Sequence, residues 1–479
     1  MSTPAPRSLA FALQAMAGTW LGPPRPDAMF AGGAFDSRAV RPGNLFFALP
    51  GERVDGFDYC AAAASAGATA VVVAAGRGIP SGLSGTDTAV IAVANPLTAL
   101  GELARAVRAT FTGGVVGVTG SNGKTTTREL CAAALGAAGT VMRTEGNYNT
   151  EIGLPLTILG ASGQERFWVL EMAMRGRGQI ALLADIARPH VGVITNVAGA
   201  HLELLGSIEE VARAKGELFA ALGSDGIAVL PGGDPLVEEQ AAHLPEAHKL
   251  RFDGGHRGPK DVRILETLSA GVAGQIVRYG VREQPVVVRL PLAGIHNARN
   301  AAAALAVAVA MDVPAPAAAA ALAATQLPPH RSFPRPAGGR IVLDDCYNAN
   351  SASMTAALES VIASAATSSP AGHAFAILGD MLELGPESAA LHHEIGRVIG
   401  TRLAGLATVG TLAAEIARGA REAGLPATKI VAVATPAEAA AAVAAWTRPG
   451  DWILVKASRG MRLERAVDAL IENFSSGSR

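Results

Sequence analysis

A glycine-rich turn behind an apolar run is the stretch of this chain with the most evident chemistry. The run occupies residues 115–119, and the turn continues as Gly120, Ser121, Asn122, Gly123, Lys124, Thr125 and Thr126. Glycines let the backbone approach an anion, and amides at a helix start, a lysine and a hydroxyl supply donors and a metal ligand. The pattern predicts a loop that binds the phosphates of ATP, with Thr125 able to reach Mg²⁺.

One position distinguishes this turn from the usual phosphate-loop pattern. That pattern has a glycine five residues before Gly123, where this chain has Val118. The loop is therefore a tighter variant, and an ordinary turn before a helix is the alternative. The order of strand, glycines, lysine and hydroxyls favours phosphate binding.

Two further polar residues follow apolar runs. Glu171 ends the run at 167–170, and His201 comes shortly after the run at 191–195. Side chains at the carboxyl ends of parallel strands point into the ligand crevice, so Glu171 is a candidate magnesium ligand. The alternatives are a solvated strand end for Glu171 and a structural role for His201.

Lys215 occupies an unusual position on a predicted helix. The sequence from Ser207 to Glu210 is a capping box, which predicts a helix that begins at Ile208. Lys215 then lies on the apolar face of that helix, where it either extends its amine to solvent or is buried with a lowered pKa. A neutral amine can react with carbon dioxide to give a carbamate, an anion able to bind Mg²⁺.

Several residues further along the chain are candidates for contacts with a nucleotide. Asn297 and Asn300 lie at the start of an alanine-rich helix, where amides cap the helix or contact an adenine edge. Arg331 follows His330 in a proline-rich stretch and could reach a γ-phosphate, while Asp345 follows a strand and could hold ribose hydroxyls. Helix capping, a surface ion pair and a simple turn are the alternatives.

The alternation of apolar runs with helical patterns predicts an α/β fold. Short strands surround a helix at 58–66 in the first 95 residues, and strands then alternate with helices to about residue 326, which implies a mostly parallel sheet with added β-hairpins at 264–292. The proline- and glycine-rich residues 326–340 are the best linker candidate, and a second parallel α/β domain follows. The expected domains are 1–95, 96–326 and 327–479.

Composition limits the classes of partner. A net charge of −1 and a pI of about 6.8 argue against nucleic-acid or membrane-surface binding. Three widely spaced cysteines fit a reduced cytoplasm and suggest neither disulfides nor a cysteine metal site. The apolar residues 301–324 are broken by an aspartate and two prolines, so no membrane span is expected, and the composition of residues 1–7 gives no expectation of a secretory signal.

Taken in chain order, these motifs resemble those of the Mur ligases, the ATP-dependent amide-forming enzymes of peptidoglycan synthesis. The signals run over nearly the whole chain, at 119–126, 201–203, 214–217, 296–300 and 330–331. Further stretches are most similar to the members that add D-alanyl-D-alanine to UDP-N-acetylmuramoyl-tripeptide; they are 36–38, 42–49, 146–153, 345–350 and 378–385. Two positions depart from the family pattern, because Cys346 replaces the usual serine and Ser351 the usual proline.

The resemblance implies three domains: one for the UDP-substrate, a central phosphate-loop ATPase built on a parallel sheet, and a C-terminal Rossmann-like domain that closes on the site. It implies a cytoplasmic enzyme, expected to be monomeric, with small-molecule substrates. The roles that it implies are phosphate binding by Lys124 and Arg331, one magnesium site at Thr125 and Glu171, a second at His201 and carbamylated Lys215, adenine binding by Asn300, ribose binding by Asp345, and UDP-substrate binding by Ser37, Arg38, Asn149 and Thr150.

Two other classes of function use the same loop. A nucleotide-dependent switch or phosphotransferase would hydrolyse ATP or phosphorylate a hydroxyl, and the apolar-face Lys215 and the linker Arg331 argue against it. Another ligase of the same fold, such as an amino-acid-adding Mur ligase or a folate-polyglutamylating enzyme, is the nearer alternative. The stretch from Asp36 to Arg38 argues against the folate enzyme.

Overall fold

The computed structural model describes residues 3–51, 54–199, 202–253, 261–271, 274–282, 284–368 and 371–476. It forms two compact units: residues 1–119, 138–193 and 217–228 make the first, and residues 120–137, 194–216 and 229–479 the second. Over the described ranges, no helix is long and apolar enough to cross a membrane.

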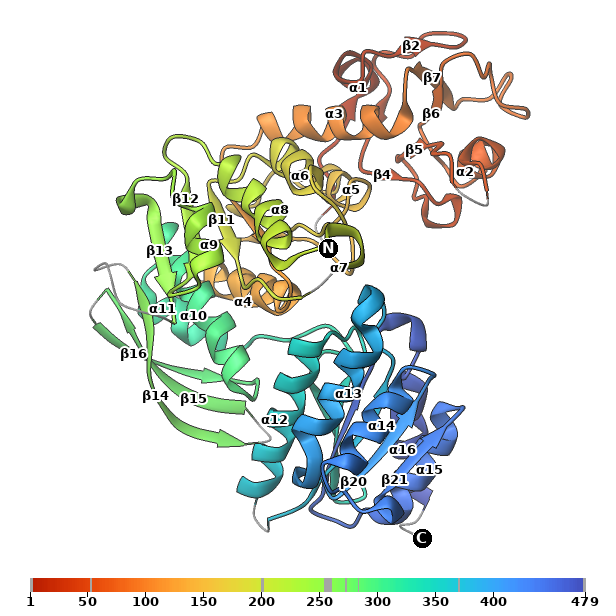
Figure 1. Ribbon diagram of the computed structural model, residues 1–479. Helices are drawn as coiled ribbons and strands as arrows, with labels where there is room; N and C mark the ends of the chain where they lie inside the picture. The colour runs from red at the N-terminus through yellow and green to blue at the C-terminus, as the bar shows by residue number, and fades with distance from the viewer. Residues whose placement is uncertain are drawn as a thin grey trace. The chain divides into compact units, whose positions relative to one another are not determined.

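The N-terminal part of the first unit contains a small sheet whose described strands lie in the order β2-β7-β6-β5-β4 (Figure 1). Strands β4 to β7 are parallel, and β2 pairs antiparallel with β7 at the edge. The expected strands here are confirmed. The elements are β1 (Arg7–Ser8), α1 (Leu9–Ala15), β2 (Thr19–Trp20), β3 (Met29–Phe30), β4 (Gly33–Ala34), β5 (Leu45–Phe47), α2 (Cys60–Ser65), β6 (Ala70–Ala74), β7 (Ala89–Val93) and α3 (Pro96–Ala109).

The central sheet has the order β16-β15-β14-β13-β12-β11-β8-β10-β9 in the described part of the chain. Strands β8, β9 and β10 are parallel, as the apolar runs predict. The elements are β8 (Gly114–Thr119), α4 (Lys124–Gly136), β9 (Val141–Arg143), α5 (Gly153–Leu159), β10 (Phe167–Glu171), α6 (Gln179–Ala187), β11 (Val191–Ile194), α7 (Leu202–Leu205), α8 (Ile208–Ala220), β12 (Ile227–Pro231), α9 (Pro235–Gln240) and β13 (Lys249–Phe252).

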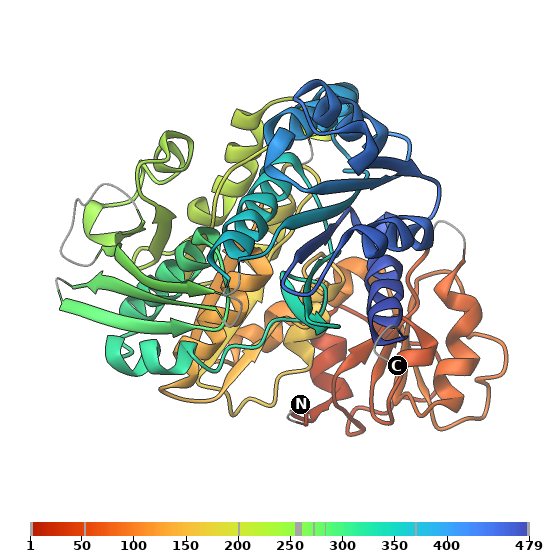
Figure 2. The ribbon, with the colours of Figure 1, turned by 90° about the horizontal axis from the view of Figure 1, so that it is seen from below.

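An antiparallel layer ends this sheet, and two alanine-rich helices follow it, as expected. Figures 1 and 2 show its long strands side by side in green, with β15 between β14 and β16. The helix α10 is buried along most of its length, because alanine side chains permit close packing on every face. The elements are β14 (Val262–Gly271), β15 (Gly274–Val281), β16 (Gln284–Leu290), α10 (Ile295–Ala310) and α11 (Ala315–Leu322).

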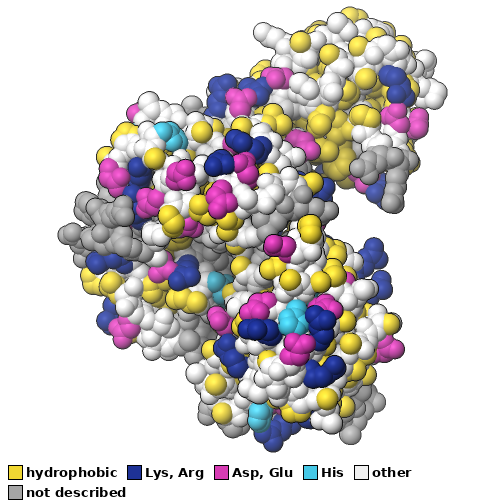
Figure 3. All heavy atoms as spheres, in the orientation of Figure 1, with side chains coloured by type: hydrophobic (Ala, Val, Ile, Leu, Met, Phe, Trp, Pro, Cys, Tyr) yellow, Lys and Arg dark blue, Asp and Glu magenta, His cyan; other side chains and the backbone are white. Residues whose placement is uncertain are grey.

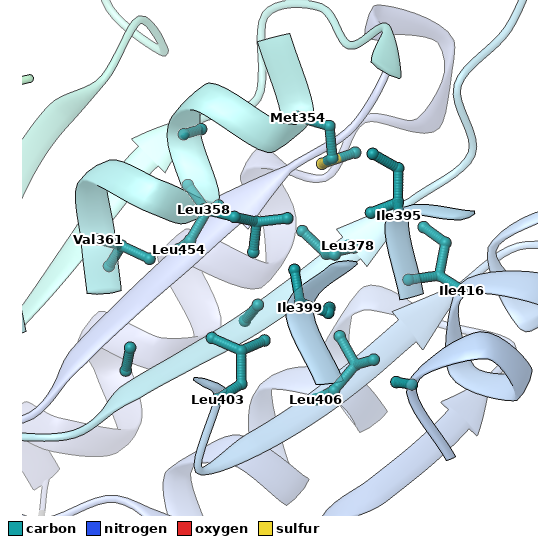
Figure 4. Close-up of a cluster of buried hydrophobic side chains, with 14 of the residues drawn as sticks. Met354, Leu358, Val361, Leu378, Ile395, Ile399, Leu403, Leu406, Ile416 and Leu454 are labelled. Atoms are coloured by element: carbon teal, nitrogen blue, oxygen red, sulfur yellow. The ribbon is translucent and has the colours of Figure 1, made fainter. Parts of the chain in front are cut away.

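The C-terminal part of the second unit is a sheet covered on both faces, with the described strands in the order β17-β18-β22-β19-β20-β21. Helices α12, α13 and α14 cover one face, and α15 and α16 the other. Figure 4 shows side chains of α12, α13 and α14 meeting those of β19, β20 and β22. The elements are β17 (Phe333–Ala337), β18 (Arg340–Asp345), α12 (Ser351–Thr367), β19 (Ala374–Gly379), α13 (Ser388–Ile399), β20 (Gly405–Val409), α14 (Ala413–Glu422), β21 (Ile430–Val433), α15 (Pro436–Trp446), β22 (Trp452–Lys456) and α16 (Glu464–Ser476).

The proline-rich stretch at 326–340 is more ordered than a linker. It contains β17, which pairs antiparallel with β18 at the edge of the C-terminal sheet. Pro334 and Pro336 are compatible with this strand because an edge strand needs hydrogen bonds on one side alone, and proline removes a donor that a central strand would need. The sequence predicted a linker here and no strand, so β17 at 333–337 was not foreseen.

On the face drawn in Figure 3, acidic and basic side chains are interspersed. This distribution agrees with the net charge of −1.

Candidate active site

The phosphate loop lies between β8 and α4, as the sequence predicts. Gly123 caps α4 with φ 76°, and Gly120 has φ 151°, so both use backbone conformations that favour glycine. Their surroundings are equally restrictive: a Cβ on Gly120 would lie 1.9 Å from Thr195 Oγ1, and one on Gly123 would lie 2.7 Å from Asn300 Oδ1. Both glycines are required by backbone conformation and by space.

Residues at the end of β11 hold the loop in shape. The Asn122 amide donates to Asn196 Oδ1 at 3.0 Å, and the Asn122 carbonyl accepts from Thr195 Oγ1 at 2.6 Å and from Asn196 Nδ2 at 3.0 Å. Ser121 bonds in the same way, since its hydroxyl donates to the Ala198 carbonyl at 3.0 Å. Thr195 and Asn196 were not predicted as site residues, although polar residues directly after an apolar strand are a usable signal.

The loop also carries the expected cation and hydroxyl. Lys124 is the first residue of α4, and its Nζ donates to the Gly120 carbonyl at 2.7 Å. Thr125 and Thr126 follow in the first helical turn and are both buried. The lysine therefore lies over the loop, beside the helix N-terminus that attracts anions.

Lys215 is buried, as one of the two interpretations of its helix predicts. It belongs to α8, which begins at Ile208 as expected, and its side chain is among the largest fully buried ones in the described residues. Burial lowers the pKa of the Lys215 amine well below 10.5, and the charge of nearby Lys124 lowers it further. A buried cation beside another cation is unfavourable, so the surroundings of Lys215 favour the neutral amine over the ammonium ion.

Glu171 ends β10 in the first unit, and its register places it opposite Val118 of β8, next to the strand end from which the phosphate loop starts. Its carboxylate is buried and accepts a 2.7 Å hydrogen bond from Asn149 Nδ2. The Glu171 amide donates to Thr144 Oγ1 at 2.9 Å. The carboxylate is therefore oriented by a neighbouring amide, as metal ligands commonly are.

Asn297 and Asn300 have different environments at the start of α10. Asn297 Nδ2 donates to the Ala293 carbonyl at 2.8 Å, which is a local contact of the helix start. Asn300 is buried, and its amide group lies against Gly123 of the phosphate loop. Asn300 is thus part of the surroundings of the loop, whereas Asn297 stabilises its own helix.

A second polar cluster lies at the carboxyl end of β18. Asp345 Oδ2 accepts from the buried Lys456 Nζ at 2.6 Å, and its Oδ1 accepts from the Ser332 amide at 2.9 Å. The Arg331 guanidinium carbon lies 3.7 Å from the centroid of the Tyr347 ring, a cation–π contact. Arg331 and Asp345 therefore lie close together in sequence and in space, on either side of the β17–β18 hairpin.

Comparisons with known proteins match most of this chain. Family models match as "Mur ligase family, catalytic domain" at 32–108, "Mur ligase middle domain" at 118–308 and "Mur ligase, glutamate ligase domain" at 330–459. A UDP-N-acetylmuramoyl-tripeptide–D-alanyl-D-alanine ligase from Mycobacterium tuberculosis is 37% identical, over 93% of this chain and 92% of that protein. The chain belongs to the Mur ligase family.

Solved structures agree with this assignment. A crystal structure of MurF from Acinetobacter baumannii has a TM-score of 0.86 at 29% identity, covering 98% of this chain and 99% of the other. MurF ligase from Thermotoga maritima in complex with ADP has a TM-score of 0.80 at 30% identity, covering 94% and 99%. The expected family and its three-domain α/β fold are confirmed.

The remaining predicted site residues of this Mur ligase lie in three parts of the chain. His201 lies outside the described residues. Arg38 lies in a short 3-10 helix, and its side chain is 89% exposed and paired with Asp36, whose pKa it lowers to about 2. Ser37 lies in the same helix, and Thr150 is exposed just before α5. Arg38 and Thr150 are therefore accessible to a ligand, and the roles of all four residues stay predictions.

Lys456 is a third residue of these clusters, after Thr195 and Asn196, that was not predicted from the sequence. It ends β22 and contacts Asp345 from 111 positions away in the chain. A strand that ends in lysine carries no local signal for such a partner, because the pairing depends on which strands become neighbours in the sheet.

Proposed function

We propose that this Mur ligase joins D-alanyl-D-alanine to UDP-N-acetylmuramoyl-tripeptide and converts ATP to ADP and phosphate. These substrates are the ones in the names of relatives that match over nearly the whole chain. The chemistry rests on one observation, the burial of Lys215 close to Lys124 of the phosphate loop, which lowers the pKa of the Lys215 amine. That pair argues for carboxylate activation over simple ATP hydrolysis or transfer to a hydroxyl.

Amide formation from a carboxylate needs activation, because oxide is a poor leaving group. The terminal carboxylate of the tripeptide attacks the γ-phosphorus of ATP, ADP leaves, and an acyl phosphate forms. The dipeptide amine then attacks the acyl carbon, loses a proton, and phosphate leaves from the tetrahedral intermediate. Lys124 and Arg331 offset the repulsion between the anions that meet in the first step.

We assign the first magnesium ion to Thr125 and Glu171, as the resemblance to the family implies. Thr125 and Glu171 are buried oxygen donors, and Asn149 already fixes one Glu171 oxygen. In the described residues, no cluster of three or more His, Cys, Asp or Glu side chains could hold a metal ion; Mg²⁺ is commonly held by one or two protein ligands together with substrate phosphates. Bound Mg²⁺ would supply positive charge at the phosphates, and His201 with carbamylated Lys215 would serve a second ion.

Formation of the carbamate needs no other catalyst than a neutral amine. The Lys215 nitrogen bonds to the carbon of CO₂ and releases one N–H proton to solvent, which leaves a carbamate anion in place of the neutral amine. The position of Lys215 favours this reaction in two ways. Burial lowers the pKa of the amine, which favours the neutral reactant, and the positive charge of Lys124 stabilises the carbamate anion.

The remaining assignments extend the proposal. Asn300 contacts adenine, Asp345 the ribose, Ser37 and Arg38 the uridine nucleotide, and Asn149 and Thr150 the muramoyl end. The domains are 1–95, 96–326 and 327–479. Cytoplasmic location and a monomeric state stay predictions.

A product assay tests the proposal. Purified protein is incubated with ATP, Mg²⁺, UDP-N-acetylmuramoyl-tripeptide and one amine at a time, and the amide product is measured by mass spectrometry. We expect product with D-alanyl-D-alanine and little with glutamate, diaminopimelate or lysine. Equal turnover with these amines, or phosphate release without amide, contradicts the proposal.

Asn149 offers a sharper test of the magnesium site. Because its amide orients Glu171, Asn149→Ala should raise the Mg²⁺ concentration for half-maximal turnover by about 10- to 100-fold, with recovery at high Mg²⁺. Asn147→Ala, an exposed position in the same loop, is the matched control. A higher KM for the UDP-substrate with unchanged Mg²⁺ dependence would instead support the muramoyl contact.

A further inference from the structure

Asn350 is a helix cap whose side chain has two partners. Its Oδ1 accepts from the Ser353 amide at 2.9 Å, which caps α12, and Ser353 Oγ returns the contact by accepting from the Asn350 amide at 3.0 Å. Its Nδ2 donates to Asn122 Oδ1 in the phosphate loop at 2.8 Å. One buried amide therefore caps α12 and bonds to the loop at the same time.

The residue that Asn350 contacts is Asn122, whose backbone is bonded to the residues after β11. Asn122 uses its backbone amide and carbonyl on Thr195 and Asn196 at the end of β11. Its side-chain oxygen is the group that Asn350 holds. The next residue is Gly123, whose φ of 76° starts α4, so the shape of the loop depends on contacts from β11 and from α12 together.

The helix α12 packs both on the C-terminal sheet and near the start of α10. Met354, Leu358 and Val361 anchor one face of it in the core of the C-terminal sheet (Figure 4). Ser360 lies beside Gly294 near the start of α10, where a Cβ on the glycine would come within 3.1 Å of the serine hydroxyl. The helix therefore touches the nucleotide-binding part of the second unit at two separate points.

We propose that Asn350 is a positioning residue that couples the docking of α12 to the phosphate loop, so that the loop binds nucleotide tightly only while α12 is docked. The inference rests on the proposed function, because it assumes that the loop binds ATP. Coupling of two equilibria is reciprocal, so nucleotide in the loop also stabilises the docked position of α12. The side chains of the two loop residues therefore have different partners. The Ser121 hydroxyl bonds to the Ala198 carbonyl after β11, and the Asn122 side chain bonds to Asn350 at the start of α12.

The substitution Asn350→Ser separates the cap from the contact. Serine caps helices about as well as asparagine, but its hydroxyl is too short to keep both partners. Asn95→Ser is the matched control, since Asn95 caps α3 through the Leu97 and Thr98 amides and belongs to the first unit. Both variants should melt within about 1 °C of the wild type, because neither loses a capping group.

Equilibrium titration with ADP is the measurement. We expect the Kd of Asn350→Ser to rise about 3- to 10-fold, the range for loss of one hydrogen bond, with a matching rise in KM for ATP and wild-type values for Asn95→Ser. In combination with Asn122→Ala, the second substitution should add nothing to the first. An unchanged Kd in Asn350→Ser, or additive losses in the double variant, would overturn the coupling.

The two proposals fail separately. A wild-type protein that binds ADP but forms no amide product rejects the proposed function and leaves the titration result intact. A wild type that forms the product, with Asn350→Ser indistinguishable from Asn95→Ser, rejects the coupling alone.

Discussion

Replacement of Lys215 by methionine should lower turnover about a thousandfold, which corresponds to ~4 kcal/mol of lost transition-state stabilisation. Methionine matches the length and burial of the lysine stem but cannot form a carbamate, so the anion expected beside the loop is lost. Turnover in the product assay is the measurement. Lys429→Met is the control, because Lys429 contacts Trp446 in the C-terminal sheet region, and it should keep wild-type activity.

Chemical rescue distinguishes a missing anion from a damaged fold. Lys215→Ala leaves space where the amine was, and added formate or acetate should restore part of the turnover there but not in Lys215→Met. In buffer depleted of CO₂, wild-type activity should fall and return with bicarbonate. Wild-type activity that is indifferent to bicarbonate, with an unmodified Lys215 mass, would remove the carbamate from the proposal.

The same lysine predicts how stability changes with pH. The folded state holds the Lys215 pKa well below 10.5, whereas the unfolded chain regains the ordinary value. Between these two pKa values the unfolded state binds the extra proton, so the free energy of unfolding rises with pH. In CO₂-free buffer, urea unfolding of the wild type should show this rise relative to Lys215→Met, and parallel pH profiles would contradict a buried neutral amine.

Local signals in the sequence predict much of this fold. Ser207 precedes α8 as the capping box predicts, and its hydroxyl accepts from the Glu210 amide at 3.3 Å. Each signal is contained within a few residues, because a cap bonds to amides two or three positions away. Lys215 belongs to this class as well, since the periodicity of one helix was enough to put it on the buried face.

Contacts across the chain are a different case. Asn122 and Asn350 are 228 positions apart, and Asp345 and Lys456 are 111 apart. Such pairs depend on strand order and helix docking, which no local pattern encodes. The edge strand β17 was missed for the opposite reason, because its prolines are typical of loops and are tolerated only since β17 has a partner on one side.

The largest loss of nucleotide binding is expected from a single methyl group on Gly120. In Gly120→Ala the new Cβ would lie 1.9 Å from Thr195 Oγ1, and the backbone would hold alanine at φ 151°. The Thr195 hydroxyl must then move away from the Asn122 carbonyl, to which it donates at 2.6 Å. The loop loses that hydrogen bond to Thr195, and we expect the Kd for ADP to rise at least about a hundredfold, as for ~3 kcal/mol of strain and lost bonding.

A glycine in the next helix provides the matched control. Gly136 ends α4, and a Cβ there would meet nothing within 4 Å, so Gly136→Ala should leave the Kd unchanged and raise stability by up to ~1 kcal/mol. Adding Thr195→Ala to Gly120→Ala removes the clashing oxygen but not the backbone strain, so binding should recover in part. If Gly120→Ala binds ADP as tightly as Gly136→Ala, the contact with β11 does not shape the loop. If the double variant recovers nothing, the backbone conformation of Gly120, rather than the space beside Thr195, is what nucleotide binding requires.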